Sequence, residues 1–122
     1  MYSITKDDKA IRTVKVYFGK EFNMDSDNEV FITFREIPTL PFMELAQIQQ
    51  KLQKKESDGI EERVELFRFF HGHFSEIYVD SNIMVSETQK ASPEEIRDIV
   101  FGSLRITLKM ITEFSDAGLL NP

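Results

Sequence analysis

The sequence motif most similar to a metal-binding motif is a pair of histidines separated by one glycine, His71 and His73. Glu76 and Asp80 follow closely, so imidazole nitrogens and carboxylate oxygens, both ligands of zinc, are available. On a helix, side chains two positions apart point about 200° from each other, so both imidazoles cannot hold one ion. We therefore expect a half-buried His71 bonded to a neighbour, a solvated His73, and no metal or other cofactor. If Gly72 breaks the helix, the two imidazoles need not point apart, and a metal site is more plausible.

Other catalytic arrangements are absent from the sequence. It contains no cysteine, neither histidine follows a serine-hydrolase pattern, and its five glycines form no phosphate-binding loop. The paired carboxylates at 61–62 and 94–95 lie at expected helix starts, where negative charge stabilises the helix dipole. We therefore expect a protein that is not an enzyme and has no catalytic residues and no small-molecule substrate. A small enzyme or metal protein built around the two histidines is a third alternative.

Length and composition predict a single globular domain. The chain has 122 residues, of which 41% are hydrophobic and 30% charged, and its eleven Phe with no Trp predict a Phe-rich core. We divide it into a loose N-terminal arm at 1–11, one α+β domain at 12–117 and a C-terminal tail at 118–122. The lack of cysteine excludes a disulfide framework and fits a reducing cytoplasm.

The charge and hydropathy of the chain exclude several classes of partner. A net charge of −6 repels phosphate backbones, so nucleic acid is not an expected partner. No apolar stretch reaches the roughly 18 residues that a membrane span needs. The N-terminus also lacks the apolar segment of a secretory signal. We expect a soluble intracellular protein that binds neither nucleic acid nor membrane.

The first half of the domain has the pattern of a β-hairpin. Apolar and polar residues alternate over 14–18 and 30–35, which predicts two antiparallel strands with the hairpin tip at 25–28. Phe22 and Met24 continue the alternation, so the first strand is expected to resume there after a bulge. Helices should follow and cover one face of the hairpin, which makes an α+β fold with a three-helix layer.

Apolar spacing predicts the three helices at about 39–54, 58–78 and 93–115, with a polar loop at 80–91. Thr39 is the expected N-cap of the first helix. The third helix is expected to start with a capping box formed by Ser92 and Glu95. The core stripe of the second helix is expected at Ile60, Val64, Phe67, Phe70, Phe74 and Tyr78.

Apolar side chains outside the expected core faces are the strongest functional signal. Phe101 and Leu108 lie one above the other outside the main apolar arc of the third helix, although a helix in a small domain needs only one apolar face. Phe69 lies on the outer side of the second helix, as a scattered surface aromatic or as a contact. Tyr17 and Phe31 project from the outer face of the hairpin, whose open edges can pair with another chain. These five residues are the partner-binding candidates.

The order of these features resembles the tail assembly chaperones of long-tailed (siphovirus-type) bacteriophages. The resemblance covers roughly residues 12–115 and is carried by the F-R-E pattern at 34–36, followed by a proline-containing turn at 37–41. An amphipathic helix, a polar break, a longer helix and a final helix opened by Ser-Pro-Glu-Glu then follow in the family order. Many members have Trp followed by Asn at the end of the second helix, where this chain has Tyr78 and, later, Asn82.

The resemblance implies a specific function. Such proteins are made in the host cytoplasm, do not form part of the mature virion, and often self-associate. They bind the tape measure protein, a long helical rod, and keep it soluble until tail tube subunits displace them. They are not enzymes and need no cofactor. The alternative is a small acidic adaptor or inhibitor that uses the same patches to bind a globular bacterial or phage partner.

Overall fold

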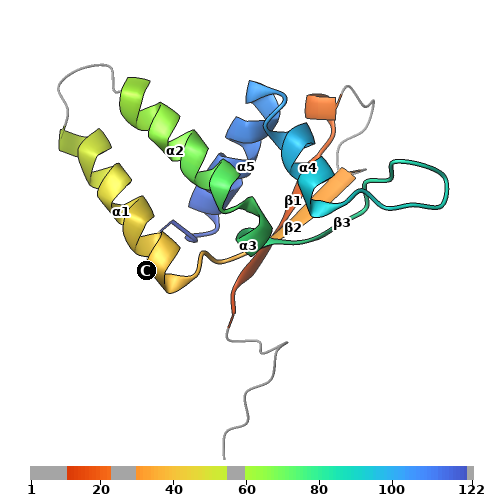
Figure 1. The fold of residues 1–122 in the computed structure, drawn as a ribbon, viewed down its shortest axis with the longest axis horizontal. Helices are drawn as coiled ribbons and strands as arrows, with labels where there is room; N and C mark the ends of the chain where they lie inside the picture. Colours follow the sequence, from red (N-terminus) through yellow and green to blue (C-terminus); the bar gives the residue numbers. More distant parts are fainter. Residues whose placement is uncertain (1–10, 23–29, 55–59, 121–122) are drawn as a thin grey trace, which may run out of the picture.

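The computed structural model describes residues 11–22, 30–54 and 60–120. A three-stranded antiparallel sheet is combined with helices, which confirms the predicted α+β fold with an N-terminal hairpin followed by helices (Figure 1). The elements in chain order are β1 (Thr13–Phe18), the 3-10 helix η1 (Lys20–Phe22), β2 (Val30–Arg35), α1 (Thr39–Lys54), α2 (Ile60–Gly72), α3 (Phe74–Ile77), β3 (Tyr78–Ser81), α4 (Pro93–Val100) and α5 (Leu104–Asp116). No helix of the described residues is long and apolar enough to cross a membrane.

The hairpin has the predicted register and faces. Val16 pairs with Ile32 and both are fully buried, whereas Tyr17 pairs with Phe31 on the opposite face. The predicted tip at 25–28 and Met24 lie outside the described residues. The expected continuation of the first strand at Phe22 is wrong, because this residue ends η1 and its ring packs edge-on against Phe18.

The sheet contains a third strand that the sequence did not predict. Its residues fall partly in the predicted helix at 58–78 and partly in the predicted polar loop at 80–91, but β3 pairs antiparallel with β2 through Ile32 and Ser81. It has only four residues, and the register with β2 shifts between Thr33 and Phe34. A strand this short has too little alternation to be recognised without its partner.

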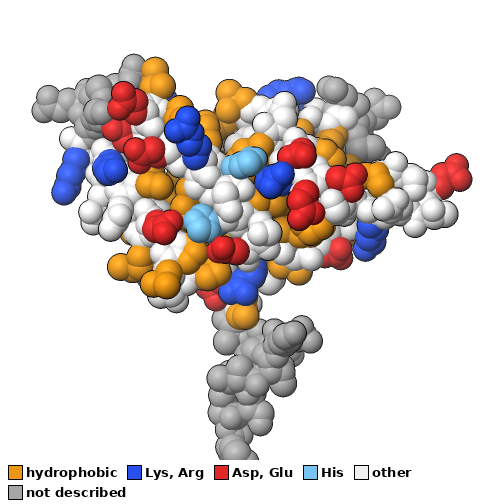
Figure 2. Space-filling view, in the orientation of Figure 1, with side chains coloured by type: hydrophobic (Ala, Val, Ile, Leu, Met, Phe, Trp, Pro, Cys, Tyr) orange, Lys and Arg blue, Asp and Glu red, His pale blue; other side chains and the backbone are white. Residues whose placement is uncertain are grey.

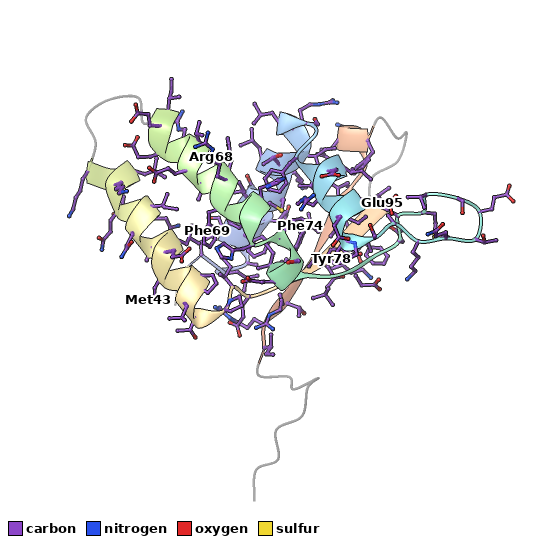
Figure 3. The ribbon with its side chains drawn as sticks, viewed as in Figure 1. Met43, Arg68, Phe69, Phe74, Tyr78 and Glu95 are labelled. Atoms are coloured by element: carbon purple, nitrogen blue, oxygen red, sulfur yellow. The ribbon has the colours of Figure 1, made fainter. Side chains whose placement is uncertain are left out.

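The predicted helix at 58–78 is shorter, and its buried face is different. α2 ends at Gly72, a turn at His73 follows, and α3 occupies the next four residues. Phe69 and Phe70 are buried, whereas Ile60 is 59% and Val64 39% exposed. α2 carries apolar residues on both sides, and α1 packs along the side that holds Phe69 (Figure 3). The expected stripe through Ile60 and Val64 is therefore wrong.

The predicted third helix is two helices. The chain turns between α4 and α5, and a Cβ on Gly102 at this turn would lie 2.8 Å from the Asp98 carbonyl oxygen. The predicted capping box at the start of α4 is confirmed, since Ser92 Oγ accepts from the Glu95 N–H (3.2 Å) and Glu95 Oε1 from the Ser92 N–H (3.0 Å). Phe101 therefore ends one helix while Leu108 lies on the next, and the expected second stripe on a single helix is wrong.

The junction of α4 and α5 depends on a buried hydroxyl group. The single hydrogen of the Thr107 hydroxyl is shared between two carbonyl oxygens, with Oγ1 2.8 Å from that of Val100 and 3.1 Å from that of Ser103, and the residue is 4% exposed. Thr107→Val is expected to lower the free energy of unfolding by about 1–3 kcal/mol, because a buried carbonyl loses its donor. Urea unfolding measures this loss, with Thr112→Val as the matched control at an exposed position of α5. Equal stability of the two variants would contradict this role of the hydroxyl.

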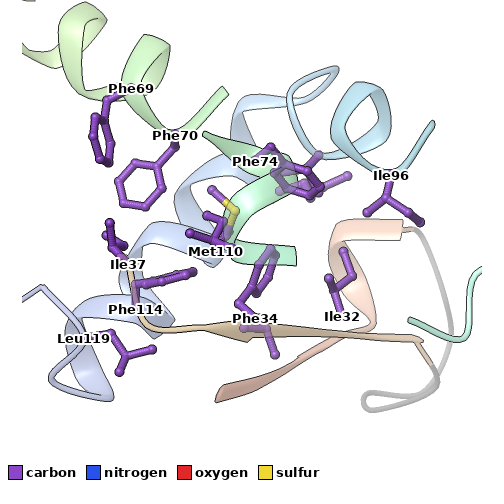
Figure 4. Packing of buried hydrophobic residues seen from close by; sticks show 14 of the residues in the cluster. Ile32, Phe34, Ile37, Phe69, Phe70, Phe74, Ile96, Met110, Phe114 and Leu119 are labelled. Atoms are coloured by element: carbon purple, nitrogen blue, oxygen red, sulfur yellow. The ribbon is translucent and has the colours of Figure 1, made fainter. Parts of the chain in front are cut away.

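Phenylalanine rings from the sheet and the helices form the centre of the core, as the composition predicts (Figure 4). The Phe34 ring lies 5.8 Å from Phe74 and 5.3 Å from Phe114, and Phe70 lies 5.6 Å from Phe114. These contacts join β2, α2, α3 and α5 into one cluster. The sheet and the helices therefore share a single core.

The end of α5 returns the chain to this core. Gly118 has a φ of +74°, the left-handed conformation that favours glycine, and the Leu119 N–H donates to the Phe114 carbonyl oxygen at 2.9 Å. Leu119 is 2% exposed and belongs to the core cluster. The segment 118–122 that we expected to be a tail is therefore part of the fold at Leu119.

Candidate functional site

An open apolar groove of about 530 Å³ lies between α1 and the residues that follow α5. Its walls combine six apolar residues with four polar ones. The apolar lining residues are Ile37, Phe42, Met43, Ala46, Leu119 and Leu120, and the polar ones are Arg12, Glu36, Thr39 and Gln49. The volume falls within the roughly 300–1,000 Å³ that is typical of ligand sites.

One wall of the groove is formed by a face of α1, and the other is formed by the segment that follows α5. Residues 39, 42, 43, 46 and 49 share one face of α1, because side chains three and four positions apart lie above each other on a helix. α1 begins at Thr39, and the Pro38 carbonyl accepts from the Phe42 N–H at 2.9 Å. Thr39 is therefore inside the first turn and does not have the expected N-cap position. The turn at Gly118 places the opposite wall.

Two of the polar lining residues, Arg12 and Glu36, connect the start of β1 with the end of β2. Arg12 Nε lies 3.3 Å from Glu36 Oε2, and the Glu36 N–H donates to the Arg12 carbonyl oxygen at 2.8 Å. Arg35 Nε also donates to the Glu36 carbonyl oxygen at 3.1 Å. These bonds fix the segment between β2 and α1, and the charges of Arg12 and Glu36 offset each other.

Large apolar side chains are exposed at the start of α1. Leu40 is 78% and Met43 59% exposed. Figure 2 shows hydrophobic side chains gathered over this part of the molecule, at the lower left of the view. Apolar surface that adjoins an apolar groove is typical of protein–protein interaction sites.

His73 joins α1 to the turn between α2 and α3. Its Nδ1 lies 3.1 Å from Glu76 Oε2, its Nε2 lies 3.4 Å from Glu44 Oε2, and its ring packs on Phe69. His71 is exposed, so the expected burial of the two histidines is reversed. The two nitrogens of His73 face different carboxylates, which makes the residue a link between elements. No three His, Asp or Glu residues of the described chain are placed to hold a metal ion.

The structure separates the five partner-binding candidates. Phe69 is only 7% exposed, so its expected place on the outer surface is wrong. Phe101 is half-buried, and its ring lies 5.2 Å from His71 and 6.2 Å from Phe74. Leu108 is 45% exposed on α5.

Tyr17 and Phe31 are the two candidates that the structure brings together. They lie on the outer face of the sheet, where their ring centroids are 6.2 Å apart. Tyr17 is 41% exposed and Phe31 is half-buried. They form a small aromatic surface on the face opposite the core.

The sequence reasoning missed the groove. Two large apolar residues near the start of the first helix, Leu40 and Met43, were a usable signal. A second signal was the Leu119–Leu120 pair directly after a glycine. Neither signal showed that the two segments meet, because they are far apart in the chain.

Comparison with known proteins supplies no family for this chain. No family model, no curated protein and no solved structure matches it. The functional interpretation therefore rests on the residues of the chain, their arrangement and the resemblance in layout.

Proposed function

We propose that this chain is a phage tail assembly chaperone whose groove binds apolar helical segments of a tape measure protein. The observation that carries the proposal is the apolar groove beside α1, together with the exposed Leu40 and Met43 next to it. The order of elements around the F-R-E pattern at 34–36 supports the same family.

The apolar lining of the groove suits a helical client. An amphipathic helix places large apolar side chains at every third or fourth position, and such a row can pack into an apolar groove. A rod protein with exposed apolar stripes would otherwise aggregate. Covering these stripes with an acidic protein of net charge −6 would keep the complex in solution.

The limited size of the groove also suits release. A groove of about 530 Å³ holds only a few side chains, so each copy of the chaperone binds weakly. A rod with many apolar stripes offers many binding sites, so many weakly bound copies together keep it covered. Tube subunits that compete for the rod can then displace the copies one at a time.

The role of a tail assembly chaperone also implies a location, an oligomeric behaviour and a class of partner for this chain. The chain acts in the host cytoplasm, self-associates, and is not part of the finished virion. It catalyses no reaction, and its partner is a protein, with no part for nucleic acid, membrane or a small molecule. An adaptor or inhibitor of a globular partner would use the same groove but would not need a helical client.

Co-expression tests the proposal. The candidate client is the product of a very long coding frame directly downstream, expressed with and without this chain. The proposal expects the rod protein to move from the insoluble to the soluble fraction and to co-purify with the chain. A rod protein that stays insoluble beside abundant folded chain would contradict the chaperone and favour the adaptor.

A further inference from the structure

We infer that the free edge of β1 is a self-association surface, on which β1 of a second copy adds in antiparallel orientation. The inference names the surface of the self-association proposed above and rests on that proposal. Its test uses the chain alone, so its failure is distinguishable from a failure of client binding. It is carried by the hydrogen-bond pattern of β1 and by the side chains that a second β1 strand would meet.

β1 has unused backbone groups along one side. In an antiparallel pair, successive residues turn their backbone N–H and C=O groups alternately toward and away from the neighbouring strand. The bond from the Glu36 N–H to the Arg12 carbonyl oxygen shows which residues of β1 face β2. The even-numbered residues of β1 therefore turn their backbone toward β2, and Thr13, Lys15 and Tyr17 turn theirs away from it. In the part of the chain that the structure describes, no hydrogen bond reaches the outward backbone groups of these three residues.

The lysine of this strand does not protect the edge. Natural edge strands commonly carry a lysine that prevents pairing with another chain. Here Lys15 Nζ lies 3.9 Å from the centre of the Phe31 ring, on the neighbouring strand, and 5.6 Å from the centre of the Tyr17 ring. The ammonium group is therefore drawn back over the outer face of the sheet and leaves the edge open.

Side-chain complementarity selects a register for two copies of β1. Two-fold registers that pair the outward backbone groups over most of β1 place Lys15 opposite Thr13, Lys15 or Tyr17 of the second copy. The Tyr17 register places an ammonium group beside an aromatic ring twice, the Lys15 register places like charges opposite each other, and the Thr13 register gives the ammonium group no aromatic partner. The Tyr17 register is therefore favoured.

The same register also suits the inner face. Val16 then faces Val16 of the second copy, and Val14 faces its Phe18. Val14 is half-buried in the single chain, so it lies at an incompletely covered border of the core. Phe18 is 1% and Val16 0% exposed in the single chain, so Val14 is the one of these three inner-face residues that still has surface for a second copy to cover.

A charge swap tests the register in solution. Sedimentation equilibrium of the full chain is expected to show a monomer–dimer equilibrium. Tyr17→Lys should raise the dimer dissociation constant about tenfold, because two Lys–Lys contacts replace two Lys–Tyr contacts. Adding Lys15→Glu to Tyr17→Lys should restore the wild-type constant to within about threefold, because each Glu then faces a Lys.

Circular dichroism serves as the folding control for these variants. Both side chains lie on the outer face, so the variants should keep the wild-type circular dichroism spectrum. A wild-type chain that stays monomeric at every concentration would overturn the inference, and so would a dimer that Tyr17→Lys leaves unchanged. A double variant that fails to recover the dimer would overturn the register. Client solubilisation by Tyr17→Lys is expected to continue, since the groove is unaltered.

Discussion

Phe70→Ala is expected to lower the free energy of unfolding by about 3–5 kcal/mol, the usual cost of truncating a buried phenylalanine. Phe70 is fully buried, and its ring contacts Phe69 at 5.5 Å and Phe114 at 5.6 Å between centroids. The truncation would leave a cavity where α2 meets α5. Urea unfolding followed by circular dichroism measures the loss.

Phe67→Ala is the matched control for this prediction, because it removes the same atoms one turn earlier on α2. Phe67 is half-buried and is not part of the described core cluster, so its truncation should cost about 1 kcal/mol. A loss at Phe67 that equals or exceeds the loss at Phe70 would contradict the buried face of α2.

The second large effect is expected in the groove. Met43→Asp combined with Ala46→Asp should reduce client solubilisation to the level seen without the chain. The two carboxylates would lie in the apolar wall, where a bound helix would have to remove them from water without a partner. The soluble fraction of the co-expressed rod protein measures this effect.

The matched control adds the same charge far from the groove, in the segment between β3 and α4. Thr88 and Gln89 are exposed there and do not line the groove. Thr88→Asp combined with Gln89→Asp should therefore leave client solubilisation near the wild-type level. Equal losses for the two double variants would place the client elsewhere or show a general effect of charge.

Features that depend on residues close together in the chain could be predicted from the sequence. The hairpin register follows from alternation, and the start of α4 follows from the Ser92 and Glu95 pair. The buried face of α2 could not be chosen locally, because apolar residues occur on both sides and the position of α1 decides between them. The turn after Phe101 was missed because the apolar spacing continues across it, although Gly102 was a possible signal.

The candidate site required the tertiary structure. Arg12, Met43 and Leu119 come from three distant parts of the chain, and no spacing rule joins them. The sequence did predict that apolar surface would remain outside the core, and it placed this surface on Tyr17 and Phe31 of the hairpin, on Phe69 and on one long helix. The structure places it at Leu40 and Met43, and also at Leu108 on α5.

Methyl NMR of the methionines tests the central claim most directly, since three of them occupy different environments. Met43 lines the groove, Met84 is exposed in the segment between β3 and α4, and Met110 is fully buried on α5. Chain labelled with ¹³C at the methionine methyl groups is titrated with an amphipathic helical peptide from the rod protein. The account predicts a saturable shift of the Met43 signal while the Met84 and Met110 signals stay in place. A bound peptide that leaves Met43 unchanged would contradict the groove as the client site.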